Sequence, residues 1–195
     1  NNSIIKDLKE IVSLLKTYQV YDKNGPIPLR RLGKDNDGGY IVPEKALQEA
    51  DVILGDGIAD DSSFEEQASA IYGKRSYGFD GSVALDTISH PLFHFTPTYI
   101  ISDAQMKAFE GVPTKYSSFD EHLKIFHLQD KKLFVKMDIE SNEYASMPDI
   151  LRYTPQITGI SFELHFLVEE QIAKALDLLK RFQKYYLLVH LHGHN

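Results

Sequence analysis

The chain has 195 residues, of which 43% are hydrophobic and 25% are charged, an ordinary composition for a globular protein. Its length predicts a single domain over residues 1–195. The net charge of −7 disfavours a large nucleic-acid-binding surface, and the absence of cysteine excludes disulfides, thiolate metal ligands and a cysteine nucleophile. Because no apolar run approaches transmembrane length, we expect a cytoplasmic protein that spans no membrane.

The first 48 residues predict an extension ahead of the main fold. Apolar residues between Ile4 and Leu15 are interrupted by charged ones, which indicates an amphipathic helix rather than a signal peptide. A cluster of glycine and proline at 24–28 ends that segment. Two short apolar pieces then flank a turn-rich stretch, which predicts a hairpin or bent loop over residues 29–42.

From residue 49 to the end, predicted strands alternate with predicted helices. We expect helices opening at residues 43–44 and covering 62–72, 117–128, 143–153 and 168–182. Strands are expected at 50–54, 75–79, 132–138, 157–163 and 185–192, with 92–95 and 99–102 as competing candidates for one more. This alternation predicts an α/β fold: a mostly parallel, Rossmann-like sheet with helices on both faces.

A glycine turn follows the first of these strands. Glycine at Gly55 and Gly57, on either side of Asp56, would let backbone amides approach a ligand closely. The dinucleotide fingerprint needs a third glycine that is missing here, so a pyrophosphate ligand is disfavoured. The acidic residues Asp56, Asp60 and Asp61 suit a cationic ligand better than a diphosphate. A plain tight turn in a solvated acidic loop explains the glycine pair equally well.

Two further positions favour a nucleoside ligand. Asp80, followed by Gly81, ends the strand over 75–79, where a carboxylate can accept hydrogen bonds from both hydroxyls of a ribose. In the hairpin, Tyr40 follows two glycines and is a candidate to stack on the cofactor or bond to it. The alternative for that hairpin segment is a surface β-turn.

Carboxylates and histidines mark the predicted ends of the late strands. Residues two apart in a strand point to the same side, and neighbouring strands lie roughly 5 Å apart. We therefore expect Asp138, Glu163, His165 and His192 to converge on one pocket. That mixture of ligands suits Mn²⁺, Fe²⁺ or Zn²⁺ better than Mg²⁺.

The alternatives to a metal site also remain open from the residues alone. His165 could act as a general base, with Asp138 and Glu163 as the other candidate catalytic groups. These polar residues could also do no more than bond to loops at the strand ends.

The segment over 133–143 resembles the strand-four signature of the FkbM-type, S-adenosylmethionine-dependent methyltransferases, roughly Lys-x-Asp-x-Glu-Gly-x-Glu. The matching residues are Lys136, Asp138, Glu140 and Glu143, while Ser141 stands where that family usually has glycine. Residues 31–40 resemble a segment that precedes the first strand in one branch of the family. A class I methyltransferase sheet normally ends with one more, antiparallel strand, and we expect either that this strand is absent here or that the given sequence does not include it.

The resemblance implies an S-adenosylmethionine-dependent O-methyltransferase. In it Gly55 and Gly57 approach the methionine part of the cofactor and Asp80 holds the ribose, with Asp56, Gly81 and Tyr40 completing the cofactor site. It implies a small-molecule acceptor, and we expect a hydroxyl of a sugar or polysaccharide precursor. The alternatives are a nicotinamide-dependent oxidoreductase, since Asp80 could serve either ribose, and a non-catalytic Rossmann-like binding module.

Overall fold

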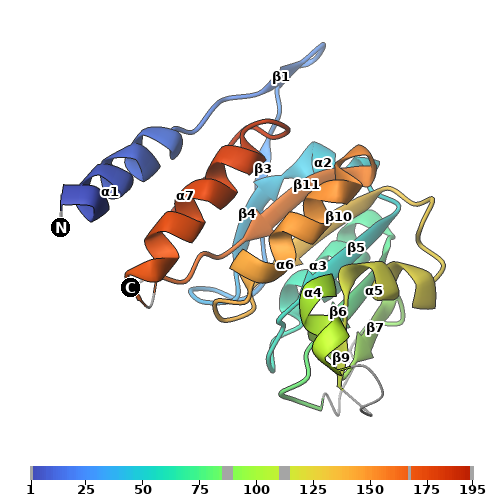
Figure 1. Ribbon diagram of the computed structural model, residues 1–195. Helices are drawn as coiled ribbons and strands as arrows, with labels where there is room; N and C mark the ends of the chain where they lie inside the picture. The colour runs from blue at the N-terminus through green and yellow to red at the C-terminus, as the bar shows by residue number, and fades with distance from the viewer. Residues whose placement is uncertain (1, 85–89, 110–114, 167, 194–195) are drawn as a thin grey trace.

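The computed structural model of the protein describes residues 2–84, 90–109, 115–166 and 168–193. Its centre is a five-stranded, all-parallel sheet in the order β7-β6-β5-β10-β11 (Figure 1). The strands are β5 (Val52–Asp56), β6 (Arg75–Phe79), β7 (Phe93–Thr96), β10 (Leu133–Met137) and β11 (Ile157–Phe162). The predicted α/β fold with a parallel sheet is confirmed.

The strand order places a switch point between β5 and β10. The chain starts the sheet at β5, adds β6 and β7 on one side, and then returns to add β10 and β11 on the other side. Lys136 of β10 lies opposite Gly55, and Met137 lies opposite Asp56. In open parallel sheets, ligands bind beyond the carboxyl ends of the strands at such a switch point.

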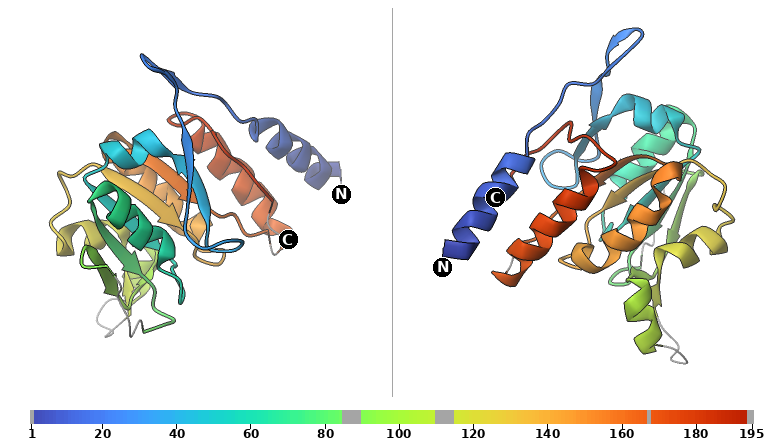
Figure 2. Two further views of the ribbon diagram at one scale, coloured as in Figure 1. Left: turned by 180° about the vertical axis from the view of Figure 1, so that it is seen from behind. Right: turned by 45° about the horizontal axis from the view of Figure 1, so that its top comes forward.

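Helices cover both faces of the sheet, as Figures 1 and 2 show. One face carries α2 (Glu44–Glu49), α3 (Ser63–Tyr72) and the hairpin of β3 (Leu29–Leu32) with β4 (Tyr40–Pro43). The other carries α5 (Phe119–Ile125), α6 (Glu143–Ile150) and α7 (Glu170–Phe182). Both faces are buried, which is why the strands are apolar on both sides.

Alternation along the strands decides which core each side chain joins. Ile53 and Phe134 pack under the hairpin, α2 and α3. Their neighbours Leu54 and Val135 pack under α5, α6 and α7. The same alternation determines where the polar residues at the strand ends point.

Local sequence signals set several helix boundaries. Ser118 caps α5 through a capping box, in which its hydroxyl accepts from the amide of Glu121 and the Glu121 carboxylate accepts from the amide of Ser118. Helix α4 (Asp103–Met106) begins in the same way at Ser102 and leads into the 3-10 turn η1 (Lys107–Phe109). Helix α6 includes Pro148 and continues as the 3-10 segment η2 (Leu151–Gln156).

The strand predicted at 185–192 is wrong. Within the described residues, the chain after α7 forms no ladder, and one backbone hydrogen bond of 2.8 Å joins it to the N-terminal segment, from the amide of Tyr18 to the carbonyl of Leu188. Apolar alternation forms a strand only beside a partner strand, and here Tyr185, Leu187 and Leu191 are exposed instead. The final residues 194–195 lie outside the described part of the chain.

The two competing strand candidates are both strands, in different sheets. Residues 93–96 form β7 at the edge of the central sheet. By contrast, β8 (Tyr99–Ile100) pairs in parallel with β9 (Tyr116–Ser117) in a separate two-stranded ladder. A further short ladder joins β1 (Tyr21–Asp22) to β2 (Gly25–Pro26) ahead of the main hairpin.

The predicted amphipathic helix is α1 (Asn2–Leu14), and it packs side by side with α7 at the margin of the molecule (Figure 1). Ile11 is buried against Ala175, Leu176 and Leu179. A 2.5 Å ion pair between Lys180 Nζ and Glu10 Oε1 lies beside this contact. No helix in the described ranges is both long enough and apolar enough to cross a membrane.

Two adjacent residues of α1 test this packing. Ile11 is 4% exposed and Val12 is 71% exposed. We expect Ile11→Ala to lower the free energy of unfolding by about 2 kcal/mol, the lower end for truncating a buried isoleucine. Val12→Ala is the matched control and should change it by less than about 0.5 kcal/mol. Urea denaturation measures both, and equal effects of the two substitutions would show that α1 does not dock on α7.

Candidate functional site

The carboxylates after β10 and β11 meet through a tyrosine of the hairpin. The hydroxyl of Tyr40 lies 3.3 Å from Oδ2 of Asp138 and 3.1 Å from Oε1 of Glu163. A hydroxyl carries one hydrogen, so it donates to one of these carboxylates at a time. Strand β4 therefore reaches over the ends of β10 and β11 and links the N-terminal extension to the sheet.

His165 lies on the other side of Asp138, three residues beyond β11. Its Nδ1 is 2.8 Å from Oε1 of Glu143. Its Nε2 is 3.6 Å from Oδ1 of Asp138 and 3.7 Å from Oε2 of Glu140. Asp138 thus stands between Tyr40 and His165 and presents a different oxygen to each.

Helix α6 fixes the position of His165. Glu143, at the start of that helix, is fully buried and also accepts a 3.1 Å hydrogen bond from the amide of Ile139. The hydroxyl of Tyr144 donates to the carbonyl of His165 at 2.9 Å. Both the ring and the backbone of His165 are therefore held by consecutive residues of one helix.

The site is strongly negative. Burial, reinforced by the charge of Glu163, raises the pKa of Asp138 to about 6, while Lys136 and His165 oppose the shift. Burial alone would lower the pKa of His165, but the charges of Glu143, Asp138 and Glu140 outweigh it and raise that pKa. The arrangement can therefore hold a cation or accept hydrogen bonds from hydroxyl groups.

Lys136 is the cation beneath this cluster. It is buried, and its Nζ lies 3.7 Å from Oε1 of Glu65 and 3.4 Å from the carbonyl of Gly57. The same Nζ lies 4.9 Å from the centre of the Tyr40 ring, which also forms a T-shaped contact with the ring of Phe64. Since the ring is enclosed by the protein itself, the hydroxyl of Tyr40, and not its ring face, is directed at the site.

The glycines of the turn are required by contacts within the protein. Gly57 has a φ of +73°, and a Cβ there would clash with the backbone carbonyl of Asp138. A Cβ on Gly55 would clash with the carboxylate of Glu65, and one on Gly81 with the ring of Tyr99. These contacts are sufficient to explain the three glycines, so the glycines do not by themselves indicate a ligand.

Asp56 is not available to a cofactor, which corrects its predicted role. Strand β5 extends two residues beyond the predicted end, so Asp56 shares the orientation of Leu54 and points into the core. It is completely buried, with Oδ1 3.5 Å from Nδ1 of His122. The His122 ring stacks on Phe79 at a centroid distance of 3.8 Å.

Hydrogen bonds within the protein already occupy most of the acceptor positions on the Asp80 carboxylate. Its Oδ2 accepts from the amide of Ala59 at 2.9 Å, and its Oδ1 accepts from the amide and hydroxyl of Ser82 at 2.7 and 2.5 Å. A carboxylate has about four acceptor positions, so one on Oδ2 remains. Asp80 therefore has room for one ribose hydroxyl and not for the two expected.

His192 does not join the other predicted ligands, because the strand that would carry it does not form. It is exposed, and its Nδ1 lies 3.3 Å from Nε2 of His190. Among the described residues, the group with metal-ligand spacing consists of Asp138, Glu143 and His165, whose ligand atoms all lie within 4.8 Å of one another. Glu143 was not among the predicted site residues, although its position in the segment over 133–143 was the signal that could have indicated it.

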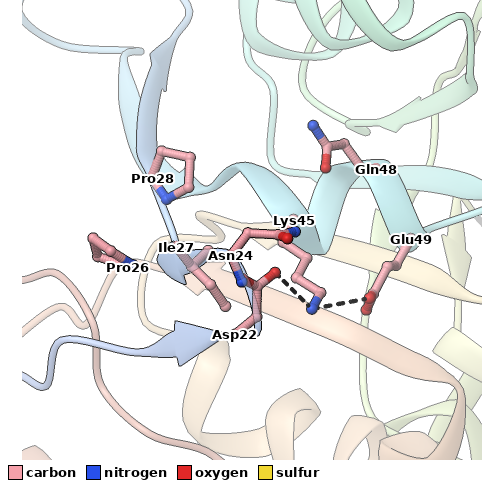
Figure 3. Close-up of a pocket in the computed structure, with 8 residues that line it drawn as sticks. All are labelled: Asp22, Asn24, Pro26, Ile27, Pro28, Lys45, Gln48 and Glu49. Carbon is pink, nitrogen blue, oxygen red and sulfur yellow. Dashed lines mark hydrogen bonds and ion pairs between the residues drawn. The ribbon is translucent and has the colours of Figure 1, made fainter.

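A cavity of about 290 Å³ lies elsewhere, between the β1–β2 hairpin and α2 (Figure 3). Lys45 in its wall is paired with Asp22 at 3.2 Å and with Glu49 at 3.8 Å. Because α2 leads into the amino end of β5, this cavity is at the opposite end of the sheet from Asp138. Its one lysine is already neutralised by the two carboxylates.

Comparisons with protein-family models, with curated proteins and with solved structures find no match for this chain. The function is therefore inferred from the side chains at the ends of the strands.

The burial of Asp56 makes a pH-dependent prediction. Burial raises its pKa from 3.8 to about 8, so the folded chain keeps a proton that the unfolded chain releases. Its contribution to stability is complete below pH 3.8 and is lost as the pH rises toward 8. The side chain introduced by Asp56→Asn does not titrate. The unfolding free energy of this variant should therefore exceed that of the wild type by an amount, the gain, that grows between pH 5 and pH 8.

Urea denaturation at the two pH values measures this gain. Burial lowers the pKa of His122 to about 3, so the neutral ring contributes to stability above pH 6.5. This contribution of His122 is lost as the pH falls below 6.5. That effect is present in wild type and variant alike and cancels in the comparison. We expect the gain to differ by at least about 1.4 kcal/mol, the value of one pKa unit. An identical gain at both pH values would contradict a protonated, buried Asp56.

The backbone conformation at Ser141 makes a second prediction. Ser141 has a φ of +79°, and its hydroxyl is buried without a hydrogen-bond partner among the described residues. Ser141→Gly should raise the free energy of unfolding by about 1 kcal/mol, because a non-glycine residue is strained there. Ser141→Ala removes the hydroxyl but keeps the Cβ, and should gain less. Thermal unfolding compares the two, and an equal or larger gain from alanine would exclude backbone strain as the cause.

Proposed function

We propose that this protein is an S-adenosylmethionine-dependent methyltransferase of the FkbM type that methylates a hydroxyl oxygen of a sugar or polysaccharide precursor. The observation that carries the proposal is the set of carboxylates at one edge of the sheet: Asp80 after β6, Asp138 after β10 and Glu163 after β11. The edge flanks the switch point between β5 and β10, where such sheets bind ligands.

The fit to the cofactor is partial and rests on Asp80. The remaining acceptor position on its Oδ2 suits one ribose hydroxyl, and the side chain is 9% exposed. When bound, S-adenosylmethionine supplies an electrophilic methyl group. The turn before α3 suits the positive charges of this cofactor, since Asp60 is exposed and Asp61 is partly exposed.

The start of α3 argues against the nicotinamide alternative. A dinucleotide places its pyrophosphate on the amides of a helix N-terminus. Here Oδ1 of Asp61 already accepts from the amide of Ser63 at 2.9 Å. Glu65 and Glu66 add negative charge in the first turn, which disfavours an anion there.

Transfer to a hydroxyl requires the chain to orient the acceptor and remove its proton. Glu163 is the proton acceptor in this proposal, because its carboxylate is partly exposed at the sheet end and hydrogen-bonds only through Oε1 to Tyr40 among the contacts of the described residues. The hydroxyl of Tyr40 also contacts Asp138, so it holds the carboxylates of Asp138 and Glu163 next to each other. Positioning and proton removal are the main contributions that a protein makes to such a step.

The acceptor class follows from the chemistry of the same edge. The carboxylates of Asp138 and Glu163 accept hydrogen bonds but donate none when ionised. His165 adds an imidazole on the far side of Asp138. Groups that mainly accept hydrogen bonds suit a ligand rich in hydroxyls, which favours a carbohydrate over an apolar acceptor.

Calorimetric titration with S-adenosylhomocysteine tests the proposal. We expect the wild type to bind it, and Asp80→Asn to weaken the affinity at least several-fold, because a hydrogen bond to a charged group contributes about 1.5–3 kcal/mol. Asp177→Asn is the control, since this carboxylate on α7 is 63% exposed and far along the chain from β6.

Two outcomes would contradict this assignment. Equal affinities of the Asp80→Asn variant and the wild type, with both folded by thermal unfolding, would remove Asp80 from the cofactor site. Binding of NAD without any binding of S-adenosylhomocysteine would replace the methyltransferase with the oxidoreductase.

A further inference from the structure

The geometry points to a binding site for one divalent metal ion, for which Mn²⁺ fits best, at the ends of β10 and β11. We infer that its protein ligands are Nε2 of His165 and the carboxylates of Asp138 and Glu140. Two oxygen ligands and one imidazole combine the preferences of Mn²⁺ and of the later transition metals. The inference rests on these contacts alone and does not depend on methyl transfer.

The tautomer of His165 is set by a buried carboxylate. Glu143 accepts the hydrogen on Nδ1 at 2.8 Å and is itself held by the amide of Ile139 at 3.1 Å. In the neutral ring, a proton on Nδ1 leaves a lone pair on Nε2. A carboxylate behind a metal-binding histidine is the usual way in which proteins orient such a ligand.

Nε2 of His165 is separated from each of the two carboxylates by nearly the distance that a coordination sphere requires. Nε2 of His165 lies 3.6 Å from Oδ1 of Asp138 and 3.7 Å from Oε2 of Glu140. Two atoms about 2.1 Å from one ion, at tetrahedral or octahedral angles, are roughly 3.0–3.5 Å apart. Each carboxylate is therefore within a few tenths of an ångström of the separation from Nε2 that a shared ion requires.

Two buried oxygens accept no hydrogen bond from the described residues. Oδ1 of Asp138 and Oε2 of Glu143 are shielded from solvent and accept no hydrogen bond, and the Glu143 side chain is completely buried. The cation nearest to them in the sheet, Lys136, is engaged with Glu65 at 3.7 Å. Uncompensated buried charge is costly, and a bound cation would remove that cost.

The backbone around Glu140 is shaped for this site. Glu140 and Ser141 are consecutive non-glycine residues with φ values of +52° and +79°. This turn brings the carboxylate of Glu140 toward His165 while leaving the side chain 84% exposed. Conformations of this kind cluster at ligand sites, and an exposed side chain can move onto an ion at little cost.

Three protein ligands leave coordination positions open to oxygen atoms of water or of a hydroxyl-bearing ligand. In catalytic metal sites such open positions are the ones that take the substrate. The ion would lie on the His165 side of Asp138, opposite Tyr40, because Oδ1 and Oδ2 of Asp138 face these two residues.

Titration of the full chain with MnCl₂, in the absence of S-adenosylmethionine, tests the site. We expect one ion per chain, counted from the electron paramagnetic resonance of free Mn²⁺. Glu140→Gln removes a charged ligand and should weaken the affinity at least about tenfold, and Glu143→Gln should weaken it about 10–100-fold by releasing His165. The control is Asp130→Asn, whose carboxylate is 82% exposed compared with 84% for Glu140, and it should bind like the wild type.

Absence of saturable binding of both Mn²⁺ and Zn²⁺ to the folded wild type would overturn the inference. So would wild-type affinity in both Glu140→Gln and His165→Gln. Because Glu140 is exposed, its variant should keep the wild-type unfolding temperature, which separates lost binding from lost folding. Calorimetry with S-adenosylhomocysteine on the same preparations distinguishes failure of the metal site from failure of the methyltransferase proposal.

Discussion

The hydrogen bond between Glu143 and His165 is the interaction on which the site depends. It joins the start of α6 to the loop after β11, two segments that the strand order brings together only because β10 and β11 are neighbours. It also determines which nitrogen of His165 faces Asp138. Without it, Nδ1 of His165 would lose the carboxylate that orients the ring, while the bond from Tyr144 to the backbone of His165 would remain.

Several carboxylates surround that bond at the edge of the parallel sheet, so the site carries an excess of negative charge. Lys136 is buried among these carboxylates and contacts Glu65 and the Tyr40 ring, so it supports the glycine turn and the hairpin together. Asp138 connects this inner layer to the outer one, since its two oxygens face Tyr40 and His165. A site built in this way favours cations and hydroxyl groups over phosphates, which is the chemical basis of both proposals.

Much of the fold could be predicted because the apolar patterns are strong. The placement of Asp138 and Glu163 at neighbouring strand ends also follows from pattern alone, since parallel strands end at one edge. Asp56 could not be placed in this way, because β5 extends two residues beyond its predicted end and directs Asp56 into the core, where it lies beside the buried His122. The prediction for His192 was wrong because alternating apolar residues indicate a possible strand but not the strand with which it would pair. Glu143 was missed because it lies on α6 and not at a strand end, although the segment over 133–143 already contained it.

The tautomer of His165 tests the account most directly, and ¹H–¹⁵N nuclear magnetic resonance of the imidazole measures it. At alkaline pH, where the ring is neutral, the account predicts a proton on Nδ1 and a free Nε2, and a change in that pattern in Glu143→Gln. A neutral ring with its proton on Nε2, or a spectrum that Glu143→Gln leaves unchanged, would contradict the orientation of His165 toward Asp138.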